Sequence, residues 1–269
     1  MRISSKLERT SLGLEPKSKY YIVPEGDNTE IQYFCGVRDN AQELGIRPLI
    51  EIIPIENDKE EFGQSHPKRK LSNFDKDLRN GKFTYDNEID KVCFVIDRDP
   101  QNLSEKQLDD FINNCKNNNY EVYLSNPTFE LFLIMHDNRV LKLDRQEMLE
   151  NRREGRKRKR FLEKKLLEYF ECNKTNLNFE KFKPNINKAK KNEKQFCEEL
   201  DGLKNKLGSN VGTLLDSMME DWVKRLHNFN KLNTFAVQYI NNVYRHERIL
   251  VPCTKVRGIF IFAKKKNVA

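Results

Sequence analysis

The chain has 269 residues, of which 33% are charged and 37% hydrophobic, and its formal net charge is +8. Its mean hydropathy of −0.81 and the lack of any long apolar run exclude an integral membrane protein. The first residues lack the apolar segment of a secretory signal, so we expect a soluble, cytoplasmic protein. The six cysteines are scattered without a Cys-x-x-Cys pair, which predicts reduced thiols and no structural zinc site.

Charge is unevenly distributed along the chain. Residues 1–150 carry a net charge of −7 and residues 151–269 one of +15, which together give the +8 of the whole chain. An acidic half suits cation binding and a basic half suits phosphate, so one molecule could hold a metal ion against a nucleic-acid backbone. The alternative is a solvated surface on which the charge is merely uneven.

The first part of the chain predicts alternating strands and helices. A polar tail over residues 1–18 precedes a buried strand at 20–24, and a helical period begins at Asn28 or Thr29, with Thr29 placed to cap it. Residues 49–55 predict a second strand. Residues 56–70 have no apolar period and predict an exposed, mobile loop.

The same alternation continues to residue 140. Residues 91–96 predict a strand, Ser104 is placed to cap the helix that follows, and residues 120–124 predict another strand. Residues 128–136 then predict a buried helix. This order of elements predicts an α/β fold over residues 19–140, with a mainly parallel sheet flanked by helices.

Residues 141–269 predict a basic, mainly helical portion. An amphipathic helix is expected to begin at Ser209 or Asn210, and residues 255–262 predict a possible final strand. Residues 151–165 hold nine basic and two acidic side chains. We expect this run to bind a phosphate backbone, with a solvated face as the alternative. Its expected contact residues are Arg152, Arg153, Arg156, Lys157, Arg158, Lys159 and Arg160.

Polar side chains follow three of the predicted strands. Glu25 follows the first, Asp97 and Asp99 follow the strand at 91–96, and Ser125 and Asn126 follow the next. Because the carboxyl ends of parallel strands meet at one edge of a sheet, we expect these residues to converge. Clustered carboxylates repel one another unless a cation is present, and Mg2+ needs only a few of them when water and phosphate complete its shell. The pattern therefore predicts a Mg2+ or Mn2+ site that acts on a phosphate substrate.

Two further carboxylates belong to the candidate site. Glu30 lies one turn into its helix and is a metal ligand, a surface residue or a capping-box partner. Glu130 lies in an apolar helix, where an unpaired charge is costly, so we expect a metal, a lysine or a hydrogen-bonded partner beside it. Glu25 could instead cap the following helix, and Ser125 and Asn126 could be turn formers only.

The chain resembles the RloB and AbiL-type family of abortive-infection proteins in three blocks, IVPEGDNTEIQYF, FVIDRDP and LSNPTFELFLIMH, and more weakly in GSNVGTLLDSMMED. The resemblance covers about residues 19–222 and implies a TOPRIM fold, whose core is one Glu and an Asp-x-Asp that bind Mg2+. The chain departs from the family at Pro24, where relatives more often have another residue. The resemblance places Glu25, Asp97 and Asp99 in the metal-binding core. It gives Glu30, Ser125, Asn126 and Glu130 as further motif positions.

The resemblance also implies a bacterial antiphage nuclease or toxin that a partner ATPase of the ABC or AAA type controls. We therefore expect a Mg2+- or Mn2+-dependent enzyme that hydrolyses phosphodiester bonds of DNA or RNA, including tRNA. Its expected catalytic residues are Glu25, Asp97, Asp99 and Glu130, with Glu30 as an additional metal ligand. The alternative is a non-catalytic TOPRIM-derived subunit that binds nucleic acid or the ATPase. A homodimer is left open.

Overall fold

The computed structural model describes residues 18–26, 28–46, 51–54, 67–98, 103–154 and 159–220. These residues belong to one compact unit, which ends at residue 222. Parts of the sequence-based predictions lie outside the described residues: Asp99, Arg156, Lys157, Arg158 and the strand expected at 255–262.

A five-stranded sheet forms the centre of this unit, in the order β2-β1-β3-β4-β7. The strands β2, β1, β3 and β4 run parallel, and β7 is antiparallel to β4. The predicted α/β fold with a mainly parallel sheet is confirmed. The strands are β1 (Lys19–Pro24), β2 (Glu51–Pro54), β3 (Lys91–Asp97), β4 (Glu121–Asn126) and β7 (Gly208–Ser209).

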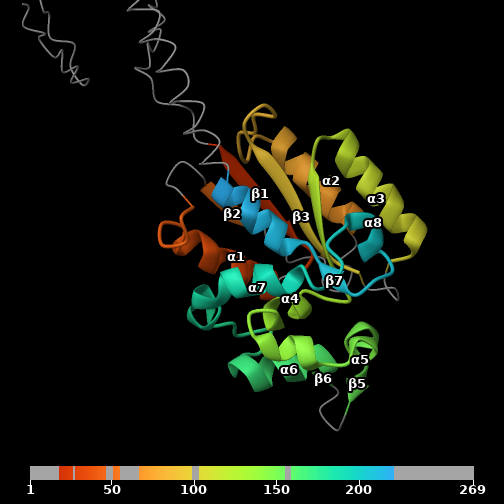
Figure 1. Ribbon diagram of the computed structural model, residues 1–269. Coiled ribbons are helices and arrows are strands. Elements are labelled where there is room, and N and C mark those ends of the chain that lie inside the picture. The colour runs from red at the N-terminus through yellow and green to blue at the C-terminus, as the bar shows by residue number, and fades with distance from the viewer. Residues whose placement is uncertain are drawn as a thin grey trace, which may run out of the picture. The chain divides into compact units, whose positions relative to one another are not determined.

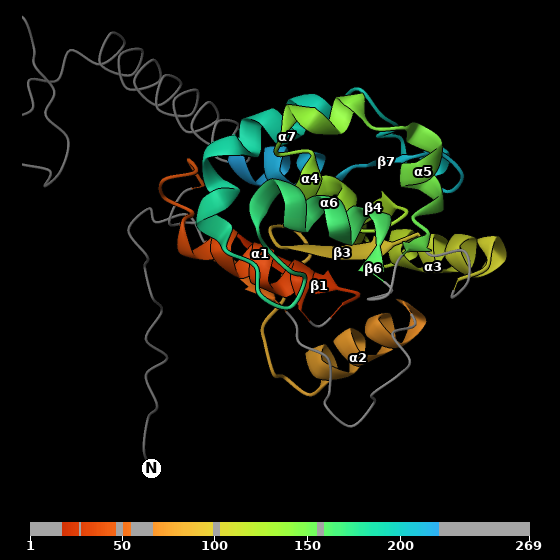
Figure 2. The same ribbon diagram turned by 90° about the horizontal axis from the view of Figure 1, so that it is seen from below.

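Successive strand residues face two different hydrophobic cores, as the period of two in an extended chain requires. In β1, Tyr20 and Ile22 pack into one core, and Tyr21 and Val23 pack into the other. Helices α2 and α3 cover the second core, while α1, α4, α6 and α7 cover the first (Figures 1 and 2). The helices are α1 (Thr29–Asp39), α2 (Pro67–Arg79), α3 (Glu105–Asn117), α4 (Glu130–Ile134), α6 (Phe161–Phe170) and α7 (Ile186–Glu193).

Helix α1 begins where the sequence predicts, but Thr29 does not cap it. Asn28 occupies the N-cap position and makes no capping hydrogen bond through its side chain. Thr29 is the first helical residue, and its hydroxyl donates instead to the backbone carbonyl of Lys174, at 3.0 Å. The capping prediction was wrong because this hydroxyl has a tertiary partner.

The predicted loop at 56–70 was wrong at its carboxyl end, where α2 begins at Pro67. Residues 55–66 lie outside the described residues. The apolar face of α2 is short, and Leu71 and Phe74 fill it by packing against the sheet. The ring of Phe74 lies 6.0 Å from that of Tyr21, centroid to centroid. Tertiary packing stabilises this helix, whose sequence is otherwise strongly polar.

Strand β4 extends two residues beyond its predicted end, so that Ser125 and Asn126 lie inside the strand and not after it. Both residues pair with β7, since Ser125 lies opposite Ser209 and Asn126 opposite Gly208. The sequence did not reveal this pairing because β7 has only two residues and no apolar alternation.

The chain beyond residue 140 packs on the same sheet through α6, α7 and a helix over residues 211–220. It also contains an unpredicted antiparallel hairpin, in which Arg153 lies opposite Arg160 and Glu154 opposite Lys159. In the described part of the chain, no helix is long and apolar enough to cross a membrane. The remaining elements are η1 (Asn138–Lys142), α5 (Arg145–Glu150), β5 (Arg153–Glu154), β6 (Lys159–Arg160), η2 (Phe179–Lys181), η3 (Lys183–Asn185) and α8 (Leu200–Leu203).

Candidate functional site

Glu25 and Asp97 meet at the carboxyl ends of β1 and β3. The backbone amide of Glu25 donates to the carbonyl of Val95 at 2.8 Å, which extends the pairing of the two strands by one residue. The carboxylate of Glu25 then accepts a hydrogen bond from the backbone amide of Asp97, also at 2.8 Å. The predicted convergence of these two carboxylates is thus present in the structure.

Asp97 is oriented by the segment that follows β4. Its Oδ1 atom accepts a hydrogen bond from the backbone amide of Phe129 at 2.8 Å. The next residue is Glu130, the first residue of α4, and only 8% of it is exposed. Asp97 and Glu130 therefore lie beside each other although 33 positions separate them in the sequence.

Glu30 reaches the same place from α1. It is buried, with 6% of its surface exposed. A Cβ atom added to Gly26 would lie 2.5 Å from Oε2 of Glu30, so the side chain is folded back over the turn between β1 and α1. Only a glycine leaves room for the carboxylate at this position.

These carboxylates interact electrostatically. Desolvation raises the pKa of Asp97 well above its usual range, and the charges of Glu30, Glu25 and Glu130 raise it further. Burial likewise raises the pKa of Glu30 from 4.5 to about 7; Glu130 and Glu25 add to this effect, while its own backbone amide and Lys70 oppose it. We call Glu25, Glu30, Asp97 and Glu130 the carboxylate cluster.

Lys70 is a member of the site that sequence reasoning missed. It lies in the first turn of α2 and is 7% exposed, and its charge lowers the pKa of Glu30. The sequence places Lys70 at the end of a polar run, between Arg69 and Leu71, and gives no sign that it is buried. Only the packing of α2 on the sheet brings its positive charge to the cluster.

The donor set of the cluster fits a hard divalent cation. Every side chain in it offers carboxylate oxygen, which Mg2+ and Mn2+ prefer, and the mutual repulsion of the carboxylates is what a bound cation would relieve. Among the described residues, no group of three acidic, His or Cys side chains is already arranged as a set of metal ligands. Mg2+ keeps several waters and needs only one or two carboxylates from the protein, so this arrangement is compatible with it.

Arg98 lies between the two aspartates of the Asp-x-Asp motif and is turned into the protein. Its guanidinium donates to the backbone carbonyls of Lys204, at 2.9 Å, and Leu103, at 2.8 Å. These bonds fix the backbone directly after Asp97. Asp99, which the motif adds to the cluster, lies outside the described residues.

Ser125 and Asn126 are also brought to this edge, but their side chains are used within the protein. The hydroxyls of Ser125 and Ser209 lie 3.2 Å apart, and the amide nitrogen of Asn126 donates to the carbonyl of Leu203 at 2.8 Å. Ser125 is fully buried, and 4% of the surface of Asn126 is exposed. These contacts attach β7 and α8 to β4, and we leave both residues out of any nucleic-acid surface.

Four of the seven basic residues predicted to bind nucleic acid are described, and all lie at the β5–β6 hairpin. Arg152 and Arg153 are exposed, and Lys159 and Arg160 are half-buried. Arg152 pairs with Glu150 at 2.8 Å, and Lys159 donates to the side-chain oxygen of Asn173 at 3.1 Å. In Figure 1 the hairpin lies with α6 on the side of the molecule toward which the strands run.

His136 is fully buried and has structural partners. Its Nδ1 lies 3.2 Å and 3.0 Å from the carbonyls of Phe132 and Leu133, so that nitrogen carries the proton. Its Nε2 then accepts the hydroxyl proton of Tyr33 at 3.1 Å. Burial lowers the pKa of His136 to about 4, which keeps the ring neutral.

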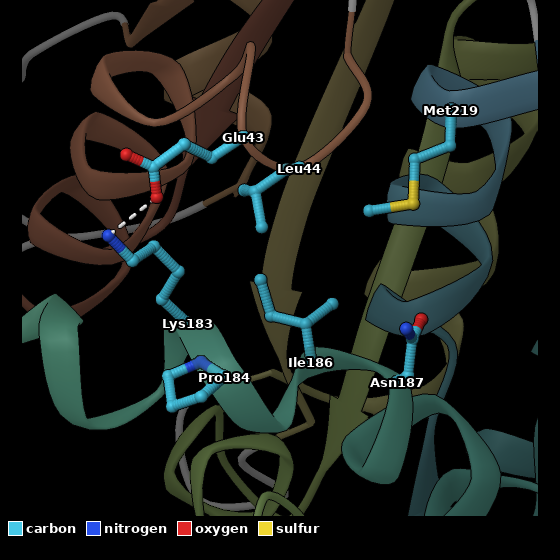
Figure 3. Close-up of a pocket in the computed structure, with 7 residues that line it drawn as sticks. All are labelled: Glu43, Leu44, Lys183, Pro184, Ile186, Asn187 and Met219. Carbon is cyan, nitrogen blue, oxygen red and sulfur yellow. Dashed lines mark ion pairs between the residues drawn. The ribbon is translucent and has the colours of Figure 1, made fainter.

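A cavity of about 360 Å3 lies elsewhere and contains none of the predicted site residues. Leu44 and Ile186 face each other across it, and Glu43 pairs with Lys183 at one side, at 2.9 Å (Figure 3). This cavity combines apolar and polar walls without a cluster of acids or bases, so it offers no catalytic chemistry comparable to that of the carboxylates.

The family model for RloB-like protein matches residues 20–220, a range that includes every described member of the carboxylate cluster. No curated protein and no solved structure matches the chain. Since the matched range covers most of the sequence, the chain belongs to the RloB-like family.

Proposed function

We propose that this protein is a Mg2+- or Mn2+-dependent nuclease that hydrolyses phosphodiester bonds of DNA or RNA, tRNA included. The observation that carries the proposal is the hydrogen bond from the amide of Asp97 to the carboxylate of Glu25, with buried Glu30 and Glu130 beside this pair. Four carboxylates that act electrostatically on one another near the carboxyl edge of a parallel sheet are costly for the fold. A cation that binds phosphate compensates for that cost.

The cluster would hold the cation through Asp97 and Glu25, with Asp99 from the same motif. When bound, the ion would neutralise charge on the substrate phosphate and lower the pKa of water. Each of the two described ligands is oriented by a backbone amide, since Glu25 accepts from Asp97 and Asp97 accepts from Phe129. The fixed orientation reduces the reorganisation needed when substrate binds.

Glu30 and Glu130 supply the remaining acidic groups. Glu30 is buried beside the two proposed ligands, so its carboxylate is placed to act as a general base for an attacking water. The positive charge of Lys70 acts on the same group from α2 and limits the rise of its pKa. These residues support the hydrolytic form of the proposal over simple ion binding.

The basic hairpin supports a polyanionic substrate. Arg153, Lys159 and Arg160 come together on two short paired strands, and this grouping suits a phosphate backbone. Membership of the RloB-like family supports a role as an effector in antiphage defence under the control of an ABC- or AAA-type ATPase.

A cleavage assay tests the proposal. The purified full chain, with and without its candidate ATPase, is incubated with plasmid, single-stranded DNA and tRNA in Mg2+ or in EDTA. We expect cleavage of at least one substrate in Mg2+, none in EDTA, and none by Asp97→Asn. Asp110→Asn is the matched control, because Asp110 is an exposed α3 residue paired only loosely with Lys68, at 3.5 Å.

Three outcomes decide between the two functions considered. Cleavage that survives EDTA or the Asp97→Asn substitution would contradict the proposed chemistry. Tight binding of a nucleic acid with no cleavage, even with the ATPase present, would favour the non-catalytic subunit. Equal loss of activity in Asp97→Asn and Asp110→Asn would mean that the loss of any acidic charge reduces activity, and it would contradict a specific role for this site.

A further inference from the structure

Residues 171–178 form a loop that is hydrogen-bonded both to α1 and to the β5–β6 hairpin. The hydroxyl of Thr29 donates to the carbonyl of Lys174 at 3.0 Å, and the amide of Leu177 donates to the side-chain oxygen of Gln32 at 2.7 Å. On the other side, the ammonium of Lys159 donates to the side chain of Asn173 at 3.1 Å. The loop is therefore attached both to the helix that carries Glu30 and to β6.

Lys174 extends from this loop between the acidic and the basic groups. Its ammonium pairs with Glu163 of α6 at 2.8 Å, and 52% of its side chain is exposed. Burial lowers the pKa of Lys174, but the hydrogen bond to Glu163 and the charges of Glu163 and Glu130 raise it overall, and Arg160 opposes them. Lys174 thus stays charged and lies within electrostatic reach of both the carboxylate cluster and the hairpin.

We infer that Lys174 binds a backbone phosphate of the nucleic acid next to the carboxylate cluster, an inference that rests on the proposed function. A partly exposed ion pair such as Lys174–Glu163 contributes only about 0–1 kcal/mol, so a phosphate group can compete with Glu163 for the ammonium. Lys174 connects the hairpin, which binds the backbone, with the carboxylates, which act on it.

A matched set of variants tests the inference in EDTA, where no cleavage occurs. Binding of a fluorescein-labelled single-stranded DNA, and of the same sequence as RNA, is followed by anisotropy over a range of KCl concentrations. We expect Lys174→Gln to weaken binding and to reduce the slope of log K against log[salt] by about 0.7, the value for one lost phosphate contact on a single strand. Lys174→Arg should retain the slope.

Lys165→Gln is the control, because Lys165 also pairs with a glutamate of α6, Glu168, at 2.7 Å. The charges that act on it are those of Glu168, Tyr169 and Glu147, none of which belongs to the carboxylate cluster. We expect this variant to bind with the wild-type slope. Glu163→Gln, which removes the competing anion, should bind more tightly than wild type.

The inference would be overturned if Lys174→Gln bound with the wild-type slope, if Lys165→Gln lost as much, or if the wild-type chain bound neither nucleic acid. Melting temperatures equal to that of wild type confirm that the variants are folded. A reduced slope in Lys174→Gln together with no cleavage of any substrate would leave this phosphate contact standing and reject the nuclease activity. Cleavage by a Lys174→Gln protein that binds with the wild-type slope would reject this phosphate contact and leave the nuclease activity standing.

Discussion

The backbone amide of Asp97 donates to the carboxylate of Glu25 at 2.8 Å. The last residue of β3 thus orients the acidic side chain that directly follows β1. The two residues are 72 positions apart in the sequence, and the pairing of β1 with β3 brings them together. This contact is the geometric basis of the candidate site. The substitutions Glu25→Gln and Asp97→Asn each replace one carboxylate oxygen by an NH2 group. The remaining oxygen can still accept the hydrogen bond from the backbone amide.

Asp97→Asn should abolish activity without unfolding the protein. The Asn side-chain oxygen can still accept from the amide of Phe129, while the negative charge that repels Glu30, Glu25 and Glu130 is gone. We expect a loss of cleavage of about 100-fold or more, in line with the loss of a catalytic carboxylate. In metal-free buffer the melting temperature should equal or exceed that of wild type. A lower melting temperature would show that the cluster stabilises the fold.

Gly26→Ala should displace the carboxylate of Glu30. The added Cβ atom would lie 2.5 Å from Oε2 of Glu30, a separation that forces this side chain to move. We expect slower cleavage, and we expect the double variant Gly26→Ala, Glu30→Gln to be no slower than Glu30→Gln alone. Additive losses in this double-mutant cycle would mean that Gly26 acts through something other than Glu30.

Glu193 should make the stability of the protein depend on pH. Burial raises its pKa from 4.5 to about 8, while its Oε1 accepts from the amide of Gly212 at 3.0 Å. Between these two values the folded state holds a proton that the unfolded state has lost, so the free energy of unfolding decreases as pH rises. One such proton gives a slope of about 1.4 kcal/mol per pH unit.

Urea unfolding at several pH values between about 6 and 8 measures this slope in metal-free protein. Glu30, whose pKa is raised to about 7, titrates in the same range, so the contribution of Glu193 is the difference between wild type and a Glu193 variant. Glu193→Gln keeps an oxygen for the amide of Gly212 and removes the titration, so its stability should vary less with pH than that of wild type. An unchanged slope in the variant would show that Glu193 is already ionised at neutral pH.

Tyr33→Phe should lower stability and leave cleavage unchanged. It removes the hydroxyl that donates to Nε2 of His136 at 3.1 Å and leaves that buried nitrogen without this donor. The expected cost is about 1–3 kcal/mol in the free energy of unfolding. Tyr85→Phe is the control, because the buried hydroxyl of Tyr85 has no hydrogen-bond partner among the described residues. Equal costs in the two variants would reject a specific Tyr33–His136 contact.

Residues with local signals were predicted well from the sequence. The apolar runs at β1 and β3 mark the strands that carry Glu25 and Asp97, and Ser104 caps α3 as expected, in a capping box that Gln107 completes. Burial of Glu130 followed from its apolar neighbours in the sequence. In these cases a period of hydrophobic residues, or a cap beside one, determines the local structure.

Residues whose roles depend on distant partners were not predicted. Lys70 is buried because α2 packs on the sheet, and Lys174 lies near Glu130 because its loop is bonded to α1. Thr29 bonds to that same loop in place of capping its helix. Long-range contacts of this kind leave no periodic pattern in a single sequence. The sequence therefore predicts an ordinary surface position for each of these residues.

Titration of Mn2+ followed by electron paramagnetic resonance tests most directly whether the carboxylate cluster is a divalent-metal site, because the signal of free Mn2+ decreases as the ion binds. We expect the wild-type chain to bind Mn2+ weakly alone and more tightly with single-stranded nucleic acid, whose phosphate completes the shell, and we expect Mg2+ to displace it. The Glu25→Gln, Asp97→Asn double variant should lose this binding, whereas Asp110→Asn should retain it. Binding by the double variant equal to that of wild type, or no binding by wild type even with nucleic acid, would contradict the metal site on which the proposed nuclease depends.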